Sequence, residues 1–162
     1  MLFSHATEYA ISAVLYLASH AESQPILVRD IASALDIPFP SLAKVVQILT
    51  RQGMLASYKG PGGGVALARP AKDMALLQVV EAIEGPGLTR ECVLGIPGCS
   101  EGTAHCPLHE QWGKIRGDIV TMLGDRNIAQ IARRLKGRKY VLTRSHGGRR
   151  LVTRPQRKRA RR

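Results

Sequence analysis

All three cysteines of this chain lie within one stretch of 15 residues. Six residues separate Cys92 from Cys99 and Cys99 from Cys106, and His109 follows three positions later. Thiolates are soft ligands that suit zinc, copper(I) and iron–sulfur clusters. An odd number of cysteines does not form a disulfide framework, and so tight a group in a reducing compartment indicates metal ligands first.

The spacing of the thiols bears on which metal they bind. Structural zinc sites usually supply cysteine pairs with roughly two to four intervening residues, and six-residue gaps match that pattern poorly. Residues 88–107 form a Gly- and Pro-rich loop that is long enough to wrap three thiolates around one centre. We therefore favour an iron–sulfur cluster over a structural zinc or a metal-free set of redox-active thiols.

A fourth ligand could come from either of two places. His109 is the local candidate, at the start of an expected helix. Glu8, on the first expected helix, is the distant candidate and could reach the loop of its own chain or of a partner. An oxygen ligand would be weak and labile, which is a useful property in a sensor. The residues alone leave both ligands open, and His5 is a third, weaker possibility.

The elements that must position these residues begin with a helix-turn-helix. Apolar residues recurring every three or four positions predict helices over residues 6–20, 29–35 and 41–53, with residues 25–28 extended. Two prolines place a turn over residues 36–40. A short helix, a tight turn and a helix with polar groups at its start are typical of a DNA-reading motif.

A β-hairpin is expected directly after this motif. Residues 54–59 and 65–68 are strand-like, and the glycine-rich residues 60–64 must turn between them. A hairpin in this position is a wing. The DNA-binding residues that we expect on the third helix and the wing are Pro40, Ser41, Lys44, Gln47, Arg51, Ser57, Tyr58, Lys59, Gly60 and Gly62.

Three further helices are predicted, over residues 74–84, 108–123 and 127–135. On the longest of them an apolar seam steps by three and four residues, as in helix pairs, through Trp112, Ile115, Ile119 and Met122. We therefore predict a homodimer, which would bind a near-palindromic double-stranded DNA operator. The expected fold class is mainly α with a small β-hairpin wing, a winged helix-turn-helix plus a long dimerisation helix.

The basic charge of the chain is concentrated near its C-terminus. The 162 residues carry a formal net charge of +12, but residues 133–162 hold 14 of the 24 Lys and Arg and none of the 12 acids. Such asymmetry indicates a polyanionic partner, nucleic acid before membrane. The expected division is a DNA-binding domain (1–84), a cysteine-rich cluster-binding loop (85–107), dimerisation helices (108–136) and a basic, disordered tail (137–162).

Several classes of protein are disfavoured. The chain shows no apolar run long enough to cross a bilayer and no N-terminal secretory pattern, so we expect a cytoplasmic protein without a membrane partner. No Ser/His/Asp constellation, paired carboxylates or phosphate-binding loop indicates an enzyme.

Four short motifs occur in a characteristic order around the three-cysteine loop. They are Thr7-Glu8-Tyr9-Ala10, Lys59-Gly60-Pro61-Gly62-Gly63-Gly64, Val79-Val80-Glu81-Ala82-Ile83-Glu84, and Cys106-Pro107-Leu108-His109 with Trp112 three positions later. In these motifs the chain resembles the Rrf-two-type winged-helix transcriptional regulators, the family of IscR/NsrR-like iron–sulfur regulators. The resemblance spans about residues 1–136.

The resemblance implies a transcriptional regulator whose operator binding is controlled by an iron–sulfur cluster sensing redox state, nitric oxide or iron–sulfur status. It implies Cys92, Cys99 and Cys106 as cluster thiolates, with His109 and Glu8 at the family's two alternative ligand positions. Because this sequence keeps both, the resemblance leaves open a [2Fe–2S] or a [4Fe–4S] cluster. The chain departs from the family in cysteine spacings that are one residue longer than usual and in its basic tail. Ala43 occupies a position where the family has an acid that can read cytosine, so we expect a different or broader operator preference.

Overall fold

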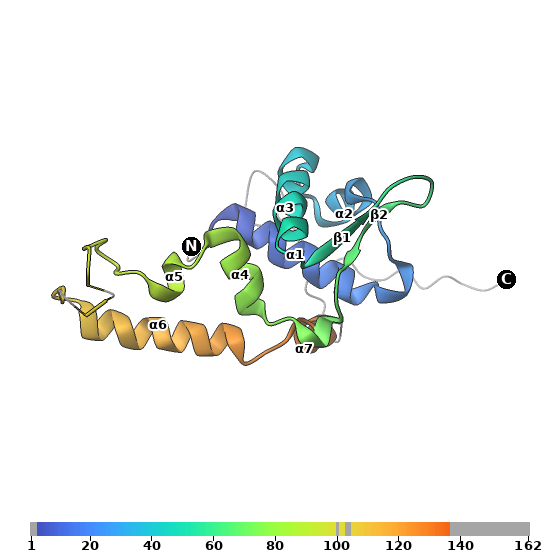
Figure 1. Ribbon diagram of the computed structural model, residues 1–162. Helices are drawn as coiled ribbons and strands as arrows, with labels where there is room; N and C mark the ends of the chain where they lie inside the picture. Colours follow the sequence, from blue (N-terminus) through green and yellow to red (C-terminus); the bar gives the residue numbers. More distant parts are fainter. Residues whose placement is uncertain (1–2, 100, 103–104, 137–162) are drawn as a thin grey trace.

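Helix α1 (His5–Ser19) lies at the centre of the fold (Figure 1). Its residues Ala10, Val14 and Leu17 are fully buried, and helices α3, α4 and α7 pack against it. The helix begins where the Ser4 hydroxyl accepts a hydrogen bond from the Thr7 backbone N–H (3.3 Å), as an N-cap does. The computed structural model describes residues 3–99, 101–102 and 105–136, and the tail expected over 137–162 lies outside them.

The predicted helix-turn-helix is formed by α2 (Val28–Leu35) and α3 (Phe39–Arg51). Helix α2 ends at Leu35, and the left-handed backbone of the next residue, Asp36 (φ 53°), reverses the chain. The inward positions expected on the third helix are confirmed as buried, namely Leu42, Val45, Val46 and Leu49.

Two boundaries of this motif differ from the prediction. Helix α3 begins at Phe39 and includes Pro40 in its first turn, so the turn ends two residues earlier than residue 40. A proline is tolerated there because the first N–H groups of a helix have no intrahelical partner. Val28 belongs to α2 rather than to the extended stretch before it.

The wing is confirmed as an antiparallel pair of strands, β1 (Leu55–Tyr58) and β2 (Gly64–Leu67). The backbone of Ile26 exchanges two hydrogen bonds with that of Val65 (2.9 and 2.8 Å), which fastens β2 to the segment that enters α2. Gly64 has no room for a side chain, because a Cβ there would collide with the Ile26 carbonyl. The hairpin is thereby held beside the helix-turn-helix.

The second half of the chain contains α4 (Leu76–Glu84), α5 (Gly87–Arg90), α6 (His109–Gly124) and α7 (Ile128–Lys136), and two 3-10 turns, Ala21–Ser23 and Ala71–Asp73, complete the elements. Helix α7 packs on α1, and its first N–H, from Ile128, donates to the Met74 carbonyl (2.8 Å). Helix α6 packs against α4 and α5 and carries the cysteine loop at one end, on the far side of α4 from the hairpin (Figure 1). None of the described helices is long and apolar enough to span a membrane.

The one-turn helix α5 differs from the sequence prediction, which has only loop between α4 and α6. The Pro86 carbonyl accepts hydrogen bonds from the backbone N–H groups of Thr89 (3.1 Å) and Arg90 (2.9 Å). A turn this short has no apolar periodicity by which a sequence pattern could reveal it.

Candidate metal centre and nucleic-acid interface

The three cysteines meet at one point near the start of α6. Their Sγ atoms all lie within 4.8 Å of one another. Cys99 and Cys106 are buried and Cys92 is half-buried. Gly98 precedes Cys99 with φ 75°, a left-handed backbone that lets the chain reverse between the first two cysteines. The predicted convergence of the thiols is therefore present in the fold.

His109 lies beside this group of thiols. Its Nδ1 is 3.2 Å from the Sγ of Cys99, and its ring stacks on that of His105 at 4.1 Å. An imidazole and three thiols form a donor set that suits soft transition metals. Of the ligands that the sequence suggests, the structure therefore brings together the three cysteines and His109.

Glu8, the distant candidate ligand, lies near the start of α1. Its Oε2 is 3.3 Å from the Nδ1 of His5. Within the described residues, the cluster of potential ligands that lie within 4.8 Å of one another comprises the three cysteines and no carboxylate. The structure does not bring Glu8 into the thiol group of its own chain.

The cysteines differ in how easily they lose a proton. Hydrogen bonding from the Ile96 backbone lowers the pKa of Cys92 to about 7, although burial opposes the shift. Burial raises the pKa of the Cys106 thiol. The lowered pKa of Cys92 favours its thiolate, which is the form that binds metals and reacts with oxidants.

Helix α6 fastens the backbone that leads into Cys92. The Trp112 indole N–H donates to the Glu91 carbonyl (2.9 Å), and the Arg116 guanidinium donates to the carbonyls of Arg90 (3.1 Å) and Glu91 (3.3 Å). The sequence places Trp112 in a helix-pairing seam and in a family motif, and it does not single out Arg116. No spacing rule reveals these contacts, because they join residues more than 20 positions apart.

Two side-chain contacts continue from this loop into the body of the protein. The Thr89 hydroxyl donates to the Glu81 carboxylate of α4 (2.9 Å). At the end of α4, the Glu84 carboxylate accepts hydrogen bonds from the buried Thr7 hydroxyl (2.6 Å) and the Ser4 backbone N–H (2.8 Å). The Thr7 hydrogen bond lowers the pKa of Glu84. Burial opposes this shift, and the hydrogen bonds from Ser4 add to it. Helix α4 thus joins the cysteine loop to the start of α1.

The residues expected to bind DNA lie on α3 and on the hairpin. Their side chains are exposed, except for that of Ser41, which is half-buried. Lys44, Gln47 and Arg51 follow one another by three and four positions on the outward face of α3, opposite its buried face. In the described part of the chain, no ion pair neutralises Lys44, Arg51 or Lys59 of the hairpin.

The sequence matches the Rrf2 family, described as iron-dependent transcriptional regulators, over residues 3–134. The chain belongs to the Rrf2 family. The IscR regulator of Vibrio atlanticus is 30% identical to this Rrf2 protein over 123 residues, which cover 76% of the chain and 70% of the relative. Its relatives are thus transcriptional regulators rather than enzymes.

Solved structures confirm the winged-helix fold of this Rrf2 protein. The structure of T. potens IscR matches with a TM-score of 0.65 at 21% identity, covering 81% of this chain and 85% of that one. CymR of B. subtilis, described as a global cysteine regulator, matches with a TM-score of 0.66 at 21% identity, covering 82% and 96%.

Proposed function

We propose that this Rrf2 protein is a dimeric transcriptional regulator that binds a near-palindromic operator under the control of an iron–sulfur cluster. The observation that carries the proposal is that three thiols from a loop meet an imidazole from the start of α6 in a winged-helix protein, and that this loop is hydrogen-bonded to α6. The site itself is made by the chain's only three cysteines.

The donor set fits such a cluster. Cys92, Cys99 and Cys106 would hold it, and His109 would be the fourth ligand, because its Nδ1 already lies 3.2 Å from a cysteine sulfur. When bound, the cluster supplies a centre that changes oxidation state and is lost on oxidative attack. The carbonyls of Arg90 and Glu91, held by α6, orient the backbone that presents Cys92.

DNA recognition would use the outward face of α3 and the wing. Lys44 can donate to guanine O6 or N7 in the major groove, and Gln47 can pair with adenine. Lys59 and the hairpin backbone would contact phosphates or the minor groove. The absence of intramolecular ion pairs at these cations in the described residues leaves them available to phosphates.

The switch would act through the segment between α4 and α6. Ligation of Cys92 would fix this segment. Loss of the cluster would free the backbone before Cys92, where Trp112 and Arg116 donate to the Glu91 carbonyl. The hydrogen bonds from Thr89 to Glu81, and from Thr7 to Glu84, would pass the change to α4 and α1. Because α3 packs on α1, the two reading helices of a dimer would change their separation.

The decisive experiment is anaerobic purification with visible absorption and with iron and sulfide counted per chain. We expect a coloured protein with roughly two or four irons per cluster, and operator binding that changes when the cluster is removed. The Cys99→Ala variant should stay a folded dimer and lose both the colour and the response. A variant that kept its absorption and its response would contradict the assignment.

A structural zinc is the second candidate, favoured by the close approach of the thiols. At a zinc–sulfur distance of about 2.3 Å, the thiolates of a tetrahedral site lie roughly 3.8 Å apart, which agrees with sulfur atoms within 4.8 Å of one another. A colourless protein that holds one zinc after anaerobic reconstitution would support this candidate and remove the cluster mechanism.

A further inference from the structure

A large aromatic side chain is exposed at the first position of α3. Phe39 is 46% exposed, although the opposite face of the same helix is completely packed. Its ring therefore adds little to the core. In a helix-turn-helix the first residues of the second helix are those that meet the base edges.

The guanidinium group of Arg29 contacts the ring of Phe39. The Arg29 guanidinium carbon lies 5.9 Å from the centroid of the Phe39 ring, in a cation–π contact between the starts of α2 and α3. Both residues are exposed, and no ion pair or hydrogen bond to the Arg29 guanidinium occurs within the described residues. The donors of Arg29 are therefore available to an external anion.

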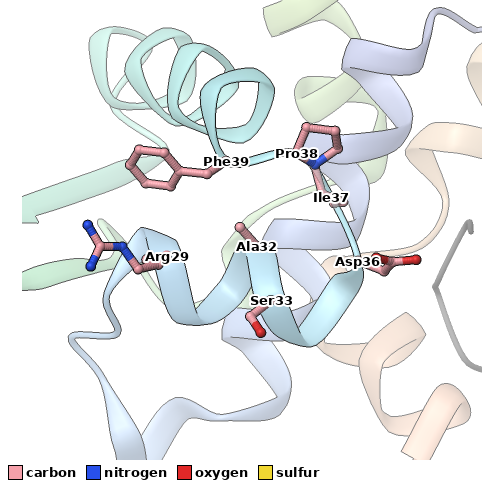
Figure 2. A pocket seen from close by; sticks show the side chains of 7 residues that line it. All are labelled: Arg29, Ala32, Ser33, Asp36, Ile37, Pro38 and Phe39. Carbon is pink, nitrogen blue, oxygen red and sulfur yellow. The ribbon is translucent and has the colours of Figure 1, made fainter. Parts of the chain in front are cut away.

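Phe39 and Arg29 flank one end of an open hollow of about 500 Å³ between α2 and α3. Figure 2 shows their side chains projecting on the same side, with Asp36 at the opposite end of the hollow. The end that carries the ring and the guanidinium is thus apolar and cationic. This combination suits an apolar group that lies next to a phosphate.

Thymine in the major groove provides such a group. Its C5-methyl distinguishes it from cytosine and is contacted by apolar side chains, phenylalanine among them. We propose that Phe39 reads the methyl group of one thymine in each operator half-site, and that Arg29 orients the ring and binds a neighbouring phosphate. This inference rests on the proposed DNA-binding function and names a specificity residue for it.

The test starts from an operator selected by the full-length protein from random duplexes. Each thymine is then replaced by deoxyuridine, which removes only the methyl group, and the Kd is measured by fluorescence anisotropy. We expect the wild type to lose about fourfold in affinity at one position of each half-site, the value of one buried methyl group. Phe39→Ala should bind the thymine and deoxyuridine duplexes equally.

Three further variants distinguish recognition of the thymine methyl group from loss of folding and from sequence-independent affinity for DNA. Phe39→Leu keeps an apolar side chain and should retain part of the discrimination. Leu27→Ala, which changes a similarly exposed apolar residue (54%) outside α3, should retain all of it. Arg29→Ala should weaken binding to every sequence and lower the slope of log K against log salt by about one per protomer.

The outcomes distinguish the inference from the function on which it rests. A protein that selects no operator contradicts the proposed function. A protein that binds its operator, but whose deoxyuridine penalty is absent or is the same in Phe39→Ala, overturns the role of Phe39 and leaves the regulator intact.

Discussion

His109 is the residue that we propose as the fourth ligand of the metal centre. Its imidazole lies beside Cys99, whereas Glu8 lies on α1 and contacts His5. We predict that His109→Ala lowers cluster occupancy by about tenfold or more, because a lost ligand opens the site to solvent and oxygen. Iron content and visible absorption after anaerobic reconstitution measure the effect. Glu8→Gln is the matched control and should leave both unchanged; bleaching by Glu8→Gln alone would transfer the ligand role to α1.

Glu84 makes the stability of the contact between α4 and α1 depend on pH. The hydrogen bonds from Thr7 and Ser4 lower the pKa of Glu84 in the folded protein below its ordinary value of 4.5. The folded state therefore favours the ionised form of Glu84. The contribution of this carboxylate to folding stability is present above the unfolded pKa and is lost as the pH falls through the lowered folded pKa.

Glu84→Gln should therefore be less stable than the wild type by about 0.5 kcal/mol at neutral pH, a small value because the carboxylate is exposed to solvent. The difference should shrink as the pH falls below 4.5 and vanish below the lowered folded pKa of Glu84, since glutamine does not titrate. Urea unfolding across the range from neutral to acidic pH measures it. A difference that stays constant across this range would show that the charge of Glu84 is irrelevant.

At the scale of elements, α6 serves as the support for the cysteine loop. Trp112 and Arg116, one turn apart, hold the carbonyls that precede Cys92. We predict that Trp112→Phe, which removes the indole N–H and keeps an aromatic ring, speeds loss of the cluster in air several-fold while leaving the melting temperature nearly unchanged. Absorption decay after exposure to oxygen measures the rate.

Lys114→Met is the matched control for this prediction, because Lys114 is an exposed side chain of the same helix that makes no hydrogen bond to the loop in the described structure. Equal decay rates in Trp112→Phe, Lys114→Met and the wild type would show that the loop is held by other contacts. The short helix α5 and the Thr89–Glu81 contact would then be the next features to test.

At the scale of the whole molecule, α6 exposes apolar residues that a single chain leaves uncovered. Ile115 is 52% exposed and Met122 is 59% exposed, and Trp112 and Ile119 are half-buried. These four residues form the seam that the sequence predicts. We propose that a second copy covers them, and predict that Ile115→Glu together with Met122→Glu raises the dimer Kd by roughly 100-fold or more, because each places a carboxylate in an apolar interface.

Sedimentation velocity across a range of concentrations tests the seam. Thr121→Glu introduces one such carboxylate at an exposed position adjacent to Met122 but off the seam, and should leave the dimer intact. If the double variant stays dimeric, the interface lies elsewhere on the molecule.

Much of this architecture can be predicted from local patterns. The periodicity of apolar residues places α1, α2, α3, α4, α6 and α7 to within about two residues, because a helix that packs on one side must repeat its apolar residues every three or four positions. The glycine run places the hairpin turn. The grouping of all three cysteines in one Gly- and Pro-rich loop is itself enough to indicate a thiol site.

Other features were decided only by tertiary structure. The approach of His109 to Cys99, the hold of Trp112 and Arg116 on the loop, the bond between Thr7 and Glu84, and the ring of Phe39 beneath Arg29 join residues that are 10 to 77 positions apart in sequence. Helix α5 is too short to leave a periodic signal. The sequence by itself determined which residues could do chemistry and which elements carry them, because residue type and periodicity are local properties. Which of those residues meet depends on how the helices pack, and that is a property of the whole chain.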